Sequence, residues 1–109
     1  MEYFIKTSQL KYKQVLPTAT MRSFWGKQLM VNIIDSAPHS QIAMHSHPHE
    51  QAGYVIHGEV EMTIGGKTAR LGPGDAYLIP SGIEHNLRGM ESWALFLDIF
   101  SPPRENYMQ

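Results

Sequence analysis

The chain has 109 residues, of which 42% are hydrophobic and 17% charged, and its formal net charge is −1. This length and composition predict one globular domain, residues 1–109, and exclude a disordered chain. Cysteine is absent, which excludes disulfides, thiolate metal sites and cysteine nucleophiles. Because the charge is nearly balanced and no basic patch stands out, we expect no nucleic-acid partner.

Membrane and export signals are also missing from the sequence. No apolar run approaches the ~18 residues that a membrane-spanning helix needs, so we expect no membrane partner. Residues Met1–Lys6 lack both the basic region and the apolar region of a signal peptide. The expected location is therefore the cytoplasm.

From residue 38 onward, glycine and proline divide the chain into short runs rich in β-branched and aromatic residues. This spacing is typical of an all-β sandwich or barrel. The predicted strands cover residues 31–34, 41–47, 54–57, 59–64, 67–71, 77–79 and 93–100. Gly65 and Gly66 join two of these strands as a two-residue hairpin. Little helix is expected, with a turn or two at residues 8–13 or 103–107.

The last predicted strand is apolar on both of its faces. One face carries Trp93, Leu95, Leu97 and Ile99, and the other carries Ala94, Phe96, Asp98 and Phe100. Both faces should therefore be buried, one of them inside a barrel. The other face needs a second layer, which a homodimer supplies most economically. We expect the N-terminal strands, within residues 1–36 and including Phe24 and Trp25, to lie at that dimer contact.

Histidine is concentrated in one short part of the chain, with five of the six between His39 and His57. On an extended strand His45 and His47 point the same way, with Cβ atoms ~6–7 Å apart, so both can bind one ion. Gln51, past a turn, can add an amide oxygen. These ligand types suit Zn, Ni, Fe, Mn, Co or Cu equally. Taken alone, the pair could also be two exposed or hydrogen-bonded histidines.

The neighbours of this pair are weaker candidates. His49 breaks the strand phase and is expected to be a supporting or surface residue. His39 and His57 are expected to face solvent. Glu50 could take the place of Gln51 in a metal site, although the spacing favours Gln51.

Two stretches of the chain carry histidine, glycine and proline at set spacings. The first, residues 45–58, holds His45, His47, Gln51 and Gly58. The second, residues 74–85, holds Gly74, Pro80, Gly82 and His85. Together they resemble the paired motifs of the cupin superfamily. The resemblance implies a single cupin domain, a jelly-roll or double-stranded β-helix barrel with little helix.

The same resemblance implies one divalent transition metal ion, held by His45, His47, Gln51 and His85. Most cupins have glutamate where this chain has Gln51. A neutral glutamine leaves the full +2 charge on the ion, which strengthens it as a Lewis acid towards an anionic oxygen. It also weakens the affinity for the metal.

The C-terminal segment, residues 92–109, adds three candidate catalytic side chains. If their shared strand face is the interior one, Asp98 and Phe100 look into the cavity. Arg104 follows two prolines and can close over the mouth, where a guanidinium would bind a carboxylate. The alternative is a structural Asp98–Arg104 ion pair at the end of the barrel. Tyr77 and Met30 could line the pocket, although such residues on strands more often belong to the core.

The stretch from His45 to Ile56, together with Asp98 to Arg104, resembles the pectin-degradation cupins of the KdgF type. That resemblance implies a metal-dependent isomerase or tautomerase that converts 4,5-unsaturated uronates to linear keto acids. It implies that Asp98 moves the proton and that the metal stabilises the developing oxyanion. Arg104 would hold the substrate carboxylate, and Phe100 would pack on the apolar face of the sugar.

Two other function classes stay open at this point. One is a metal-dependent cupin oxygenase or isomerase that acts on another small enol or diketone. The other is a non-catalytic sugar- or metal-binding module. Asp98 discriminates between them, because a binder has little need of a proton shuttle in its cavity. In each case we expect a small-molecule partner, a sugar acid or a similar carboxylate.

Overall fold

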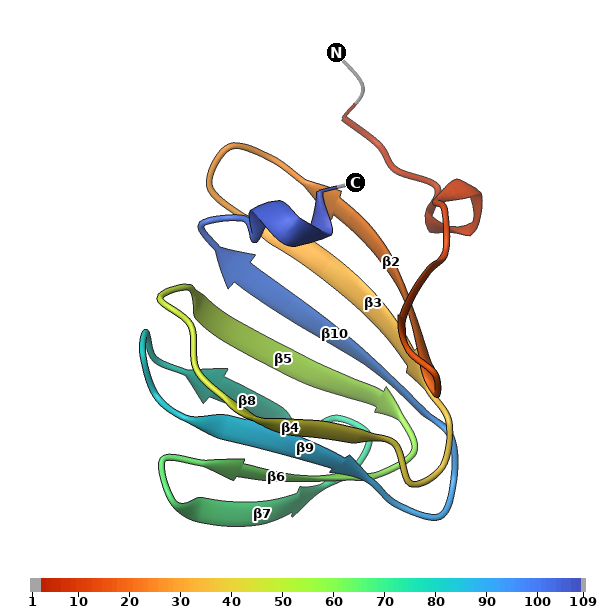
Figure 1. The fold of residues 1–109 in the computed structure, drawn as a ribbon. Helices are drawn as coiled ribbons and strands as arrows, with labels where there is room; N and C mark the ends of the chain where they lie inside the picture. Colours follow the sequence, from red (N-terminus) through yellow and green to blue (C-terminus); the bar gives the residue numbers. More distant parts are fainter. Residues whose placement is uncertain (1–2, 109) are drawn as a thin grey trace.

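The computed structural model describes residues 3–108. Residues 1, 2 and 109, at the ends of the segments 1–36 and 92–109, lie outside the described residues. Its strands form two antiparallel sheets that face each other (Figure 1). The six-stranded sheet has the order β1 (Lys13–Leu16), β2 (Ala19–Trp25), β3 (Met30–Ser36), β10 (Ala94–Ser101), β5 (Glu50–His57) and β8 (Ala76–Ile79). The four-stranded sheet has the order β4 (Gln41–His45), β9 (His85–Gly89), β6 (Val60–Ile64) and β7 (Lys67–Leu71). The predicted all-β jelly roll is confirmed.

The predicted strands are present, with some ends shifted. The hairpin between β6 and β7 turns at Gly65 and Gly66, whose φ angles of 56° and 80° have the positive sign that a type I′ turn requires. The prediction for residues 41–47 was too long, because the β4–β9 ladder ends at the pair of His45 and His85, ahead of Pro48. Proline cannot donate to a ladder, so the chain leaves the sheet there.

Three strands, β1, β2 and β9, were not predicted individually. β9 contains one large apolar residue, Leu87, which faces the core. A strand with a single such residue shows no alternation of apolar and polar residues in the sequence. Helix in the described residues consists of two 3₁₀ turns, Thr7–Gln9 and Glu105–Tyr107. No helix among residues 3–108 has the length and apolar character needed to cross a membrane. The cytoplasmic location stays a prediction.

The apolar core lies between the two sheets. Val55, Val60, Ile79 and Phe96 are fully buried there, and each such side chain contributes about 1.5–3 kcal/mol relative to an exposed one. The inner face of β10 is buried as predicted. Its outer face is not buried within this chain, since Ile99 is 40% exposed.

Candidate metal centre and active site

Three histidines come together between the sheets. His45 ends β4 and pairs with His85 at the start of β9, while His47 lies in the loop that leads to β5. Their ring centroids are 4.3–5.5 Å apart. One nitrogen from each ring lies within 4.8 Å of the other two, which is close enough for all three to contact one ion.

The backbone sets the tautomer of each ring. Each Nδ1 is 2.9–3.0 Å from a backbone carbonyl, with the pairs His45–Ala43, His47–His49 and His85–Ile83. A nitrogen that donates to a carbonyl carries the ring's proton, so Nε2 is left with a free lone pair. Nε2 of His85 is buried and meets no hydrogen-bond partner within the described part of the chain.

Electrostatics keeps two of these rings neutral, as a metal ligand must be. Burial lowers the pKa of the His47 imidazole, and the positive charge of Arg104 lowers it further. Burial likewise lowers the pKa of His85. Both rings therefore present lone pairs rather than protons at neutral pH.

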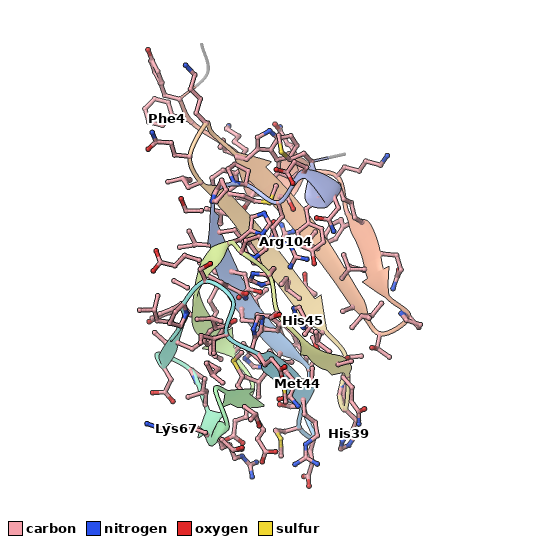
Figure 2. All side chains as sticks on the ribbon, turned by 60° about the vertical axis from the view of Figure 1, so that its left-hand side comes forward. Phe4, His39, Met44, His45, Lys67 and Arg104 are labelled. Atoms are coloured by element: carbon pink, nitrogen blue, oxygen red, sulfur yellow. The ribbon has the colours of Figure 1, made fainter. Side chains whose placement is uncertain are left out.

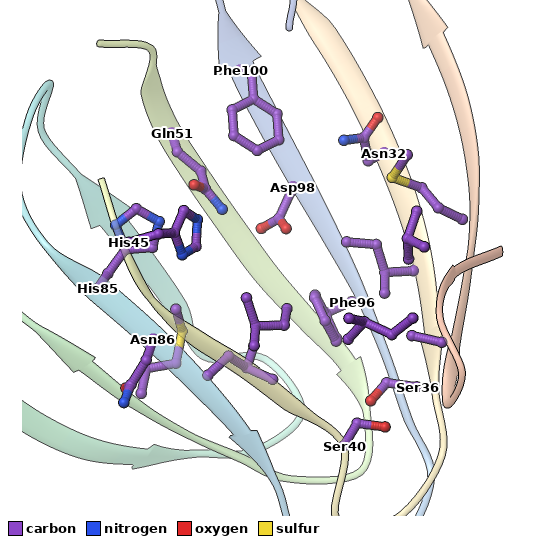
Figure 3. A pocket seen from close by; sticks show the side chains of 18 of the residues that line it. Asn32, Ser36, Ser40, His45, Gln51, His85, Asn86, Phe96, Asp98 and Phe100 are labelled. Atoms are coloured by element: carbon purple, nitrogen blue, oxygen red, sulfur yellow. The ribbon is translucent and has the colours of Figure 1, made fainter. Parts of the chain in front are cut away.

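The side chain of Gln51 joins the histidines to a buried carboxyl. Its amide nitrogen is turned towards Asp98, where the Gln51 side chain lowers the pKa of the carboxyl, and its Oε1 lies 3.1 Å from Nε2 of His47 (Figure 3). In the tautomer described above, these two atoms are both acceptors and would repel each other. A cation between them makes the arrangement favourable. The residues present therefore fit a divalent metal ion with three imidazole ligands and one amide oxygen.

Asp98 lies on the inner face of β10 and points into the cavity, as predicted. It is only 6% exposed, and it accepts a 2.5 Å hydrogen bond from the hydroxyl of Tyr77. Burial raises the pKa of this carboxyl to about 6. A group with such a pKa can take up and release a proton near neutral pH at small cost.

Tyr77 reaches Asp98 across the intervening strand because residue 53 is glycine. Gly53 on β5 stands between Tyr77 on β8 and Asp98 on β10. A Cβ atom at Gly53 would lie 1.9 Å from Cζ of Tyr77, inside the ring's own volume. From the sequence, Tyr77 was expected mainly in the core, and Gly53 was assigned no role. An isolated glycine within a strand was the available signal of such a close approach.

The C-terminal segment covers the mouth of the cavity. The Arg104 guanidinium packs on the rings of Phe100 and Tyr107, with centroid distances of 5.2 and 4.5 Å. These three side chains line the same cavity as Asp98. Arg104 lies above His45 in the view of Figure 2. No Asp98–Arg104 ion pair forms among residues 3–108, so the purely structural alternative is not found.

The remaining candidates lie outside this cluster. Glu50 is exposed and does not join it. His49 is half-buried and supports the cluster through its carbonyl, which accepts from Nδ1 of His47. His39 and His57 are exposed, as predicted. His39 lies at the end of the molecule away from Arg104 (Figure 2).

A jelly roll with a histidine cluster between its sheets is the architecture of a cupin, and comparison with known proteins agrees. The family model for the cupin domain matches residues 32–100, so the chain belongs to the cupin family.

Within that family the chain is KdgF-like. Pectin degradation protein KdgF of Dickeya dadantii (strain 3937) is 31% identical over 85 residues, which cover 77% of each chain. The solved structure of KdgF from Halomonas sp. is 28% identical and has a TM-score of 0.91, over 97% of this chain and 98% of that one. An RmlC-like cupin from Shewanella frigidimarina NCIMB 400 has a TM-score of 0.92 over 98% of this chain and 96% of its own, at 24% identity. At that identity the last match bears on the fold alone.

Proposed function

We propose that this cupin is a metal-dependent enzyme that opens the ring of 4,5-unsaturated uronates and ketonises them to linear keto acids. One observation carries the proposal: Gln51 lies 3.1 Å from His47 of the candidate metal centre and turns its amide nitrogen towards the buried carboxyl of Asp98 in the same cavity (Figure 3). An electrophilic centre and a proton-transfer group therefore face the same cavity. Both groups are needed to turn an enol into a ketone.

The relatives support the class of substrate. Two proteins similar to this chain bear the name KdgF, and one of them is a pectin degradation protein. Pectin is a polymer of uronates, and a lyase that cleaves it leaves a 4,5-unsaturated uronate at the new chain end. The monomeric form of that sugar is a cyclic enol ether with a hemiacetal carbon, and its carboxylate is an anion.

In the proposed reaction, Asp98 acts first as a base. It takes the proton of the C1 hydroxyl while C1 becomes an aldehyde and the bond between C1 and the ring oxygen breaks. The electron pair of that bond stays on the ring oxygen as an enolate. Asp98 then returns the proton to C4, and the enolate becomes the C5 ketone. Atoms and charge balance without an oxidant or a reductant.

The remaining roles fall to residues around Asp98. We assign metal binding to His45, His47, Gln51 and His85. A divalent ion held there supplies Lewis-acid stabilisation of the developing enolate charge. Arg104 binds the substrate carboxylate, for which its positive charge at the cavity mouth is suited. Phe100 packs on the apolar face of the sugar with the part of its ring that Arg104 leaves free.

The test is the ultraviolet absorbance of the substrate's conjugated double bond. Metal-loaded protein is mixed with freshly lyase-generated unsaturated monouronate. We expect the absorbance to fall faster than the spontaneous rate, and a chelator to remove the acceleration. An unchanged rate at confirmed metal occupancy contradicts the proposal. Oxygen uptake with small enols would then test the oxygenase alternative.

We also propose that the protein is a homodimer. The outer face of the six-stranded sheet carries Tyr54, Leu78, Ile99 and Trp93, each 40–60% exposed. An apolar surface of this kind is unusual for a monomer and suits an interface. Phe24, on the outer side of β2, would extend the contact towards the N-terminal strands, whereas Trp25 follows the inward parity of Ser23 and does not share that face.

A further inference from the structure

The inner face of the six-stranded sheet carries a polar row that crosses five strands. Cross-strand pairing aligns Ser23 on β2, Asn32 on β3, Asp98 on β10, Gly53 on β5 and Tyr77 on β8. The four residues with side chains are at most 9% exposed. Buried polar groups are costly unless they are hydrogen-bonded, so each member of the row needs a partner.

Asn32 is the member whose hydrogen bonds are incomplete. It is 0% exposed, and its Oδ1 accepts a 2.8 Å hydrogen bond from the hydroxyl of Ser23. That bond fixes the amide, so Nδ2 turns the other way. Nδ2 is buried and has no partner within residues 3–108. Asn32 lines the cavity, and its nitrogen lies on the side of Phe100 and Asp98 (Figure 3).

We propose that the Asn32 amide binds the substrate, donating a hydrogen bond to a hydroxyl or carbonyl oxygen of the sugar acid. The inference rests on the proposed function, because it names a further contact in the same cavity. Asn32 lies two strands from Gln51 in the sheet order β3–β10–β5. Two strand spacings are roughly 10 Å, a span that one sugar-acid ring with its substituents can bridge.

The direction of the amide indicates which part of the ligand it meets. The histidines lie on one side of Asp98 and Asn32 on the other (Figure 3). A sugar whose reacting oxygen faces the histidines presents its opposite edge to Asn32. That edge carries hydroxyl oxygens, which accept from an amide N–H. Asn32 therefore binds and orients the ligand and takes no part in proton transfer.

Two substitutions and one control test the contact. Asn32→Leu removes the donor at similar volume. Ser23→Ala frees the amide to turn away from the cavity. Ser36→Ala is the matched control, since Ser36 lies on the same face of β3 but at the end of the cavity away from the histidines (Figure 3), and its hydroxyl donates to the backbone carbonyl of Ala37. Each metal-loaded variant is titrated calorimetrically with D-galacturonate, a saturated sugar acid that cannot undergo the reaction, and assayed on the unsaturated monouronate.

We expect Asn32→Leu to raise the Kd for D-galacturonate and the KM about tenfold, as loss of one hydrogen bond does, with metal content and kcat nearly unchanged. Ser23→Ala should give a smaller rise and Ser36→Ala none. If Asn32→Leu does not fold, the Kd and KM of Ser23→Ala alone decide whether the Asn32 amide binds the ligand.

The inference is overturned if Kd and KM of the tested variants stay within twofold of the wild type, because Nδ2 then serves only a water molecule. It is also overturned if the wild type does not bind D-galacturonate. A wild type that binds this probe but leaves the unsaturated uronate unchanged overturns the proposed function instead. The Kd values then still decide the role of Asn32.

Discussion

Each face of the six-stranded sheet carries residues that depart from the usual distribution of polarity. The inner face buries Asp98, Asn32 and Tyr77. The outer face leaves Leu78 60% exposed and Ile99 40% exposed. Soluble sheets ordinarily place apolar residues inward and polar residues outward.

The contrast between the faces indicates why each of them keeps residues that lower the stability or solubility of an isolated chain. Polar groups in an interior are retained at a cost in stability when they serve a ligand or a reaction. Apolar groups on a surface are retained when another surface covers them. We therefore propose that the inner face serves chemistry and the outer face serves association. Substitutions on each face should affect one property and spare the other.

The largest loss should come from the histidine cluster. His85→Ala removes one of three imidazoles and leaves a buried gap beside His45. We expect stoichiometric metal binding and all acceleration of the uronate reaction to disappear. The control is His39→Asn, because His39 is exposed and has a φ of 61°, which asparagine tolerates. Metal content by mass spectrometry and absorbance assays measure both effects; full activity of metal-free His85→Ala would refute the assignment.

A second substitution tests the support of Asp98. Tyr77→Phe removes the 2.5 Å hydrogen bond to the carboxylate while keeping the ring. Hydrogen bonds to charged groups contribute about 1.5–3 kcal/mol, so kcat should fall about ten- to a hundredfold. KM should change little, because Tyr77 acts through Asp98.

The matched control for Tyr77→Phe is Tyr54→Phe. Tyr54 is 48% exposed on the outer side of the same sheet, and loss of its hydroxyl should leave turnover unchanged. Steady-state kinetics separate kcat from KM. A rise in KM alone would mean that Tyr77 touches the substrate instead of holding Asp98.

Gln51→Glu should strengthen metal binding and lower kcat. A glutamate adds a negative ligand beside His47, so the protein should retain metal longer during dialysis against a weak chelator. The same change removes the amide N–H that is turned towards Asp98 and lowers its pKa, and it brings two carboxylates together. We expect kcat to fall about tenfold, the effect of one lost hydrogen bond. Tighter metal binding with undiminished turnover would contradict the role given to the Gln51 amide.

The outer face should influence assembly and spare catalysis. Ile99→Glu places a charge on the outer side of β10, which lies between β3 and β5 in the six-stranded sheet. We expect the wild type to sediment as a dimer and this variant as a monomer, with kcat within about twofold of the wild type. Thr68→Glu on β7 of the other sheet is the control. A monomeric wild type would refute the dimer.

The sequence predicted the parts of the site that depend on local spacing. Residues two apart on a strand share a face, which placed Asp98 and Phe100 together in the cavity. The contribution of Tyr77 could not be predicted in this way. Its contact with Asp98 depends on the order β8–β5–β10 and on the missing side chain at Gly53, and both are properties of the assembled sheet.

Asn32 was missed for a related reason. It interrupts an apolar run on β3, and a polar residue in that place normally faces solvent. Only the pairing of β2 with β3 brings the Ser23 hydroxyl to its oxygen and turns the nitrogen inward.

Asp98→Asn tests the central claim most directly, because asparagine preserves the shape of the side chain and removes its ability to carry a proton. Metal content, D-galacturonate binding and the absorbance change of the unsaturated monouronate are measured on the same metal-loaded sample. We expect metal and ligand binding close to those of the wild type, with turnover reduced at least about a hundredfold. Turnover within a fewfold of the wild type would contradict the account, since the proton would then move without Asp98.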